Sequence, residues 1–298
     1  MAAEGVFAPH FDPTKHLGFT PPSKTYFMEE LGFDRDMGVS PVAVSEPFPL
    51  FTQEAVMRFR EEVLSQEVKD NFKIYSTVSQ CQLRYAPFAF EAWKSPEVQR
   101  IISDIAGLEL VPAMDIDIAH INLSEPSREN DYDDKAATVN WHKDSYPFVC
   151  IVMLSDCSQM IGGETAIRTG TGEIMKVRGP QMGCAVVFQG RYIEHQALRA
   201  LGGTERITMV TAFRPKDPFA HDDTILMNIR PITNLAELYA QYSEYRLEIL
   251  EQRIRAELKK IREARATGRA IPTRKLKSFL EQQQRFLEHM NGEIIEDD

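Results

Sequence analysis

The sequence has few cysteines, no long apolar run and no excess of positive charge. Its four cysteines show no CxxC spacing, and Cys150, Cys157 and Cys184 lie in apolar stretches where cysteine behaves as a small hydrophobic residue. This pattern favours a reducing, cytoplasmic location over a disulfide framework. The start of the chain has neither a basic nor an apolar region, so we expect no secretory signal and no membrane span.

The net charge is −10, which argues against nucleic acid as a partner because phosphate binding requires a basic face. Hydrophobic residues make up 43% of the 298 positions, as in ordinary globular proteins. A chain of this length builds one large domain or two small ones. Internal repeats and low-complexity segments are absent from the sequence.

Three parts are predicted along the chain. Residues 1–50 are rich in Pro, Phe and Gly, and we expect an arm that wraps a central domain or covers its mouth. The central domain, residues 51–232, begins with helices predicted from Thr52 to Ser65 and from Ser95 to Gly107. Residues 233–298 form a C-terminal helical extension.

Beyond Gly107 the hydrophobic period changes from 3.6 to 2. The spacing of turn signals predicts an α+β protein with a sandwich or jelly roll, because no helical crossovers separate the strands. The predicted strands cover residues 110–123, the His142 segment, 148–154, 162–167, 173–177, 184–188, 192–198 and 206–213.

The C-terminal extension has two amphipathic helices, one after Asn234 and one from Thr273. In the first, apolar residues follow a 3, 4, 3, 4 spacing from Leu235 to Ile249. Two interpretations stay open: packing of the helices on the outside of the β-domain, or a homodimer formed by the helical hairpin.

Val139 to Ser145 contains the pair His142-x-Asp144. In a β-strand, residues two apart point to the same face, so an imidazole and a carboxylate would project side by side. Together they would hold a divalent metal with incomplete coordination.

A third ligand is expected from a distant strand on the same side of the roll. Of the seven histidines, His10 and His16 lie in the arm, His221 and His289 follow the β-region, and His120 fits a core histidine. His195 remains, in a predicted strand near the end of the β-region. Two histidines and one carboxylate leave three adjacent positions open on an octahedral metal, the arrangement of non-haem Fe(II) enzymes that activate O₂.

Arg206 and Thr208 share one face of the next strand. A guanidinium with a hydroxyl beside it, on the inner face of a roll, suits a carboxylate ligand. A buried arginine requires an anion, and the alternative is a structural ion pair with Glu164 or Glu205.

These motifs, in this order, resemble the 2-oxoglutarate/Fe(II)-dependent oxygenase superfamily over about residues 110–215. The matching features are His142-x-Asp144, His195, Arg206-x-Thr208, the Gly162-Gly163-Glu164-Thr165 turn and the segment from Pro180 to Phe188. The overall pattern is similar to that of fungal enzymes of secondary metabolism.

The resemblance implies a double-stranded β-helix (jelly roll) in which His142, Asp144 and His195 bind Fe(II). Arg206, with Thr208, would hold 2-oxoglutarate. The implied reaction is oxidation of a small metabolite by O₂, usually hydroxylation but also desaturation or cyclisation, with release of succinate and CO₂. The alternatives are the same chemistry on a protein side chain, or a non-enzymatic cupin-like metal-binding protein.

Several further polar residues have weaker patterns. A structural role is expected for Asn122, with a hydrogen bond to the cosubstrate as the alternative, whereas Trp141 and Lys143 would point away from the metal pair. Arg214 and Arg168 are expected in structural or solvent-facing roles. Asp115-x-Asp117 is expected on a solvated strand face, and the loop 124–137 is expected to be a lid.

Overall fold

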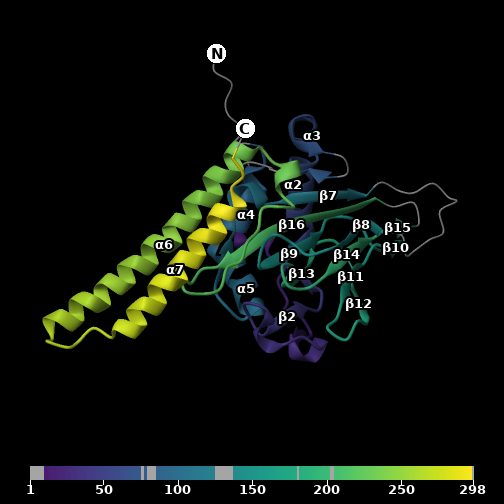
Figure 1. Cartoon of the computed structure of the whole chain (residues 1–298). Coiled ribbons are helices and arrows are strands. Elements are labelled where there is room, and N and C mark those ends of the chain that lie inside the picture. The colour runs from purple at the N-terminus through teal and green to yellow at the C-terminus, as the bar shows by residue number, and fades with distance from the viewer. Residues whose placement is uncertain are drawn as a thin grey trace, which may run out of the picture.

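A computed structural model describes residues 10–74, 77–78, 85–124, 137–179, 181–201 and 205–296. It has a central body of antiparallel sheets, helices on one side of this body, and a long helical hairpin that projects away from it (Figure 1). A mixed α+β protein with antiparallel sheets is therefore confirmed. Every helix within the described ranges is too short or too polar to span a bilayer.

The larger sheet has ten strands in the described part of the chain, and β16 lies at its centre. In spatial order the strands are β1 (Thr25–Phe27), β2 (Val42–Ser45), β13 (Cys184–Phe188), β9 (Phe148–Met153), β16 (Arg206–Pro215), β7 (His120–Ser124), β5 (Thr77–Val78) and β4 (Lys73–Ile74), with β3 (Phe48–Pro49) beside β13 and β6 (Leu110–Pro112) beside β16.

A smaller sheet carries the candidate metal ligands. Its spatial order is β12 (Ile174–Val177), β11 (Thr165–Arg168), β14 (His195–Leu198) and β8 (Ala137–His142), and a separate pair consists of β10 (Ile161–Gly162) and β15 (Ala200–Leu201). Because β14 and β8 are neighbours, residues far apart in sequence meet in this sheet.

Short helices cover the outer face of the larger sheet and form the main core with it. They are α2 (Gln53–Val63), α3 (Gln66–Phe72), α4 (Pro87–Lys94) and α5 (Pro96–Ala106). Thr52 and Ser95 cap α2 and α5 through their side chains, and Gly107 ends α5 in the left-handed region, as predicted. Trp93 is fully buried and lies on α4, a helix that was not predicted from the sequence.

Successive side chains of β16 point to opposite faces of the larger sheet. Ile207 and Met209 belong to the core beneath the helices. Arg206, Thr208 and Val210 point the opposite way and line a cavity that also contacts the smaller sheet. The predicted shared face of Arg206 and Thr208 is therefore confirmed.

The arm contributes strands and small helical turns to the body. β2 and β3 pair with β13, and the Gln189 side chain bonds backbone groups between Val39 and Val42. Its helical turns are α1 (Pro13–His16), η1 (Glu29–Leu31) and η2 (Arg35–Met37).

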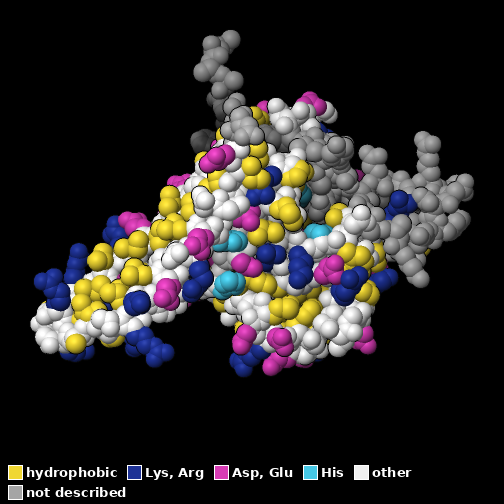
Figure 2. Space-filling view, in the orientation of Figure 1, with side chains coloured by type: hydrophobic (Ala, Val, Ile, Leu, Met, Phe, Trp, Pro, Cys, Tyr) yellow, Lys and Arg dark blue, Asp and Glu magenta, His cyan; other side chains and the backbone are white. Residues whose placement is uncertain are grey.

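The C-terminal hairpin consists of α6 (Leu235–Ala266) and α7 (Thr273–Glu293), and a 3-10 turn η4 (Arg230–Ile232) precedes it. The half of α6 nearest the body packs through Leu238, Tyr242 and Tyr245 in a second core. The far half of the hairpin extends beyond the body, where hydrophobic side chains gather on its surface (Figure 2).

The prediction of one strand over residues 110–123 is wrong. β6 is followed by a 3-10 turn, η3 (Asp115–Asp117), and then by β7. Ala119 adopts a positive φ of 59°, which interrupts any continuous strand. Met114, Ile116 and Ile118 are all buried, so the apparent alternation came from a turn with apolar residues on its inner side.

Candidate metal centre

The pairing of β8 with β14 brings His142 directly opposite His195. Their ring centroids are 4.3 Å apart. β8 ends at His142, so Asp144 lies in the following loop and not in the strand. Its backbone N–H donates to the Gly190 carbonyl at 2.9 Å, which holds this loop against the chain just before β14.

The predicted reason for the proximity of His142 and Asp144 is therefore wrong, although the two side chains do meet. A turn at the strand end, anchored to Gly190, replaces the expected same-face alternation within one strand. The structure brings together all three predicted ligand residues.

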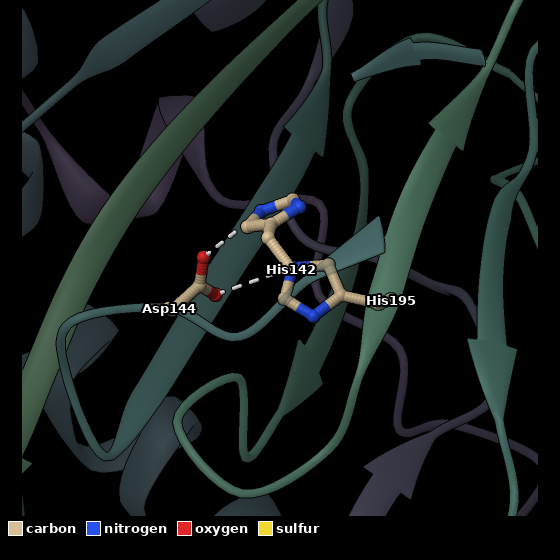
Figure 3. A group of neighbouring side chains, drawn as sticks. All are labelled: His142, Asp144 and His195. Carbon is tan, nitrogen blue, oxygen red and sulfur yellow. Dashed lines mark ion pairs between the residues drawn. The ribbon is translucent and has the colours of Figure 1, made fainter. Parts of the chain in front are cut away.

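One carboxylate lies between two imidazoles at this site. His142 Nε2 is 3.4 Å from Asp144 Oδ1, and His195 Nε2 is 3.5 Å from Asp144 Oδ2. Figure 3 shows one carboxylate oxygen directed toward each ring. The three potential ligand atoms lie within 4.8 Å of one another.

Backbone carbonyls hold the other nitrogen of each ring. Nδ1 of His142 lies 2.8 Å from the Asn140 carbonyl, and Nδ1 of His195 lies 2.9 Å from the Ile193 carbonyl. A carbonyl only accepts, so each Nδ1 carries the proton and donates it. In the neutral rings both Nε2 lone pairs then face a carboxylate, which is repulsive unless a cation, a metal or added protons, lies between them.

The charges of the site are strongly coupled. Burial acts to raise the pKa of the Asp144 carboxyl. The nearby His195 and His142 together outweigh burial and hold this pKa below its ordinary value. Against the opposite effect of burial, the Asp144 carboxylate raises the pKa of His142. Asp144 is therefore a permanent anion that requires positive charge beside it.

Gly190 leaves the space that Asp144 occupies. A Cβ atom at Gly190 would lie 1.9 Å from Asp144 Oδ2 and 3.0 Å from Asp144 Cβ. No side chain fits there without displacing the carboxylate, so this close approach requires glycine.

A cavity of about 300 Å³ lies between the two sheets and includes the three ligand residues. Arg206, Thr208, Val210 and Ala212 of β16 line it from the larger sheet. The two imidazoles and Asp144 therefore face a space large enough for small molecules.

Arg206 is a buried guanidinium without an acidic partner. Its side chain is 4% exposed, and in the described part of the chain no carboxylate oxygen lies within 4.0 Å of it. Its Nε donates to the Gly163 carbonyl at 2.8 Å, and Nη1 lies 3.4 Å from Thr208 Oγ1. Burial lowers the pKa of Arg206 to about 10, so it keeps its charge at neutral pH.

The two glutamates considered as structural partners do not form ion pairs with Arg206. Glu205 instead contacts Arg60, with Nη2 and Oε1 2.5 Å apart. Glu164 acts on the Arg206 pKa only from a longer range, and its buried Oε2 has no hydrogen-bond partner among the described residues. The predicted Gly162-Gly163 turn orients Arg206 instead, since both glycines have a φ of 71° and Gly163 supplies the accepting carbonyl.

The remaining polar candidates separate into two groups. His120 and Asn122 line the cavity, whereas His120 was expected in the core. Outside it, Arg168 stacks on Trp141 with its Cζ 4.4 Å from the ring centroid and contacts Glu194, and Arg214 stacks on Tyr245. Residues 125–136, most of the predicted lid, lie outside the described residues.

The residues at the other end of the cavity were not predicted from the sequence. Asp117, expected on a solvated strand face, lines the cavity instead and accepts a short hydrogen bond from the Tyr146 hydroxyl. Ser145 and Asn228 line the cavity as well, and Asn228 donates to the Lys143 carbonyl at 2.9 Å. The alternation expected of a strand could not predict that Asp117 faces the cavity, because Asp117 lies in a 3-10 turn.

No protein-family model matches the sequence, and no curated protein matches it. Among solved structures, SnoK, the non-heme alpha ketoglutarate dependent carbocyclase from nogalamycin biosynthesis, is similar with 16% identity over 65% of this chain and 88% of that chain, at a TM-score of 0.43. AviO1 from Streptomyces viridochromogenes is similar with 17% identity over 60% of this chain and 91% of that chain, at a TM-score of 0.40.

A 2OG-Fe(II) oxygenase family oxidoreductase from Burkholderia pseudomallei has 15% identity over 44% of this chain, at a TM-score of 0.34. The match spans 56% of that enzyme's length.

Proposed function

We propose that this protein is a 2-oxoglutarate- and Fe(II)-dependent oxygenase that oxidises a small organic molecule, with release of succinate and CO₂. The observation that carries the proposal is the buried Arg206, which has no carboxylate oxygen within 4.0 Å among the described residues and lines the same cavity as the His142, Asp144 and His195 cluster. A metal-binding protein without enzymatic activity would have no use for such an anion site.

The residues present fit a divalent iron ion. The two imidazoles and one carboxylate supply three ligand atoms from one side, and the fixed Nδ1 hydrogen bonds orient both Nε2 atoms toward the ion. Iron in such a site supplies oxidising power by activating O₂. The presence of Asp144 disfavours halogenation, because the halogenating members of the superfamily that the sequence resembles lack the carboxylate ligand.

Arg206 and Thr208 fit the distal carboxylate of 2-oxoglutarate. The guanidinium keeps Nη atoms for an anion because Nε is already bound to Gly163. Thr208, which is 1% exposed, adds a hydroxyl beside it. These residues would fix the position and direction of the cosubstrate relative to the metal cluster.

The apolar walls of the cavity would limit water near the reacting centre. Val149, Ile151, Val210 and Ala212 line it beside the polar residues. Its volume of about 300 Å³ supports a small molecule rather than a polypeptide segment as substrate. Hydroxylation is the proposed outcome, with desaturation and cyclisation as alternatives and a protein side chain as the alternative substrate.

We also propose that the two facing sheets form a double-stranded β-helix within residues 51–232. Antiparallel pairing throughout and a ligand-bearing cavity between the sheets support this assignment. Residues 1–50 would then be an arm added to the edge of the larger sheet, and residues 233–298 a helical extension.

Succinate formation tests the proposed function. The protein, supplied with Fe(II), 2-oxoglutarate, ascorbate and O₂, should form succinate, as measured by mass spectrometry. His142→Ala should abolish this activity, and Arg206→Ala should raise the 2-oxoglutarate concentration required for half-maximal activity at least tenfold, because it removes a charge-assisted contact. Arg168→Ala, which removes an arginine outside the cavity, is the control and should leave both values unchanged.

Absence of succinate with the unmodified protein would contradict the proposal, and so would unchanged turnover in His142→Ala. If the unmodified protein does form succinate, the small metabolites that stimulate succinate release would identify the substrate class.

A further inference from the structure

The cavity has two distinct ends along β16. Arg206 and Thr208 mark one end. At the other end, the Ala212 carbonyl accepts a hydrogen bond from the Ala113 N–H at 2.9 Å. This contact positions η3, which carries Asp117. Arg206 and Ala212 are six positions apart on an extended strand, a distance of roughly 20 Å. A ligand held at the Asp117 end would therefore not compete with one held by Arg206.

Asp117 is a carboxylate without a cation. Its Oδ2 accepts from Tyr146, and in the described part of the chain no basic side chain lies within 4.0 Å of its carboxylate. Two other carboxylates of the interior have basic partners: Asp222 lies 3.6 Å from Arg246, and Glu293 lies 2.9 Å from Arg230.

The environment of Asp117 leaves its charge uncompensated by the protein. Burial raises the pKa of Asp117 to about 7, and the Tyr146 hydrogen bond opposes this rise only in part. Val149, Ala212, Ile229 and Ile232 supply apolar walls that cannot solvate a carboxylate. A bound cation would remove this cost, whereas a neutral hydrogen-bond donor would leave the charge uncompensated.

A second unpartnered acceptor lies in the same region. Ser145 lines the cavity, and its buried hydroxyl has no hydrogen-bond partner among the described residues. Its neighbour in sequence is Tyr146, the donor to Asp117. Two acceptors, one of them charged, suit a group with several N–H donors.

We propose that the Asp117 end of the cavity binds a protonated amine on an apolar skeleton, with the Asp117 carboxylate as its counter-ion and Ser145 as a second acceptor. The assignment of this amine as the substrate rests on the proposed oxygenase function. The charge preference itself depends only on the residues of this end.

Isothermal titration calorimetry of the full chain at pH 8, without iron, 2-oxoglutarate or reductant, tests the charge preference. The probes are 2-phenylethylamine and tryptamine, each compared with the alcohol of the same skeleton, 2-phenylethanol and tryptophol. Each amine should bind at least tenfold more tightly than its alcohol. The ratio should fall to about one in Asp117→Asn, which keeps the shape of the side chain and removes its charge.

Two controls separate Asp117 from other acids. Asp115→Asn removes an exposed carboxylate two positions away that pairs with Lys94, and it should preserve the amine preference. Asp144→Asn removes the other carboxylate of the cavity and should preserve it as well.

Equal binding of amines and alcohols, a preference that survives in Asp117→Asn, or no binding of any probe would overturn the inference. The calorimetry is done without iron, 2-oxoglutarate or reductant, so it measures binding of the probes and not turnover. Loss of the amine preference with intact succinate formation would therefore overturn this inference alone, and the opposite result would overturn the proposed oxygenase function alone.

Discussion

At the scale of single residues, the space beside Gly190 controls the position of Asp144. We predict that Gly190→Ala weakens Fe(II) binding at least tenfold, because the added Cβ would overlap the Asp144 carboxylate. Metal affinity measured by equilibrium dialysis checks this. Gly292→Ala is the matched control, since nothing lies within 4 Å of its added Cβ. Equal affinity in both variants would show that Asp144 is not a ligand.

The raised pKa of Asp117 makes the free energy of unfolding depend on pH. Its folded-state pKa of about 7 lies above the ordinary value of 3.8, so ionisation opposes folding as pH rises between these values. Asp117→Asn should therefore gain stability relative to the unmodified protein, by roughly 1.4 kcal/mol per pH unit at most between pH 4 and 7. Tyr146, the titratable group bonded to Asp117, stays neutral because burial raises its pKa further.

Urea unfolding of the metal-free protein at several pH values measures this difference. Asp115→Asn should show no comparable gain, because Asp115 is exposed. A constant difference between Asp117→Asn and the unmodified protein across this range would refute the pKa assignment.

Individual site residues were predictable where strand alternation or side-chain chemistry determined them. Arg206 and Thr208 follow from period 2, and His195 follows from the need for a third ligand. Asp117 was not predictable, because its direction depends on a 3-10 turn and on the positive φ of Ala119.

At the scale of elements, Gln189 connects the end of β13 to the N-terminal arm. The fully buried amide accepts from Val39 N–H at 2.8 Å and donates to the Ser40 and Val42 carbonyls at 2.8 and 2.6 Å. We predict that Gln189→Leu lowers the free energy of unfolding by about 3 kcal/mol or more, because it leaves these backbone groups unpaired.

Chemical denaturation checks this prediction, with the exposed Gln181→Leu as control. A loss below about 1 kcal/mol would mean that the arm does not depend on this contact.

The boundaries of most elements followed from local chemistry. Thr52, Ser95 and Gly107 mark helix ends through caps that depend on short-range contacts. The arm strands β2 and β3 could not be predicted from periodicity, because they are short and depend on pairing with β13. Tertiary contacts decide such segments.

At the scale of the whole molecule, the far half of the C-terminal hairpin presents an apolar stripe. Leu247, Ile254 and Leu258 are between 41% and 49% exposed on α6. Glu251 and Arg255 lie beside the stripe and form an ion pair with each other at 2.7 Å, so a second copy would meet an apolar surface whose bordering charges are already paired. We predict a homodimer through this surface.

Light scattering coupled to size-exclusion chromatography measures the mass directly. The double variant Ile254→Glu and Leu258→Glu should be monomeric with unchanged succinate formation, because the stripe lies away from the cavity. Ile174→Glu, at an exposed apolar residue on β12, should remain dimeric. A monomeric unmodified protein would contradict the dimer.

We propose that one iron ion binds the His142, Asp144 and His195 cluster beside 2-oxoglutarate held by Arg206. Anaerobic titration of the protein with Fe(II) and 2-oxoglutarate, followed by visible absorption, tests it most directly. We predict a weak charge-transfer band that saturates at about one iron per chain, is absent in His142→Ala and requires far more 2-oxoglutarate in Arg206→Ala. No band with the unmodified protein, or an unchanged band in His142→Ala, would contradict the claim.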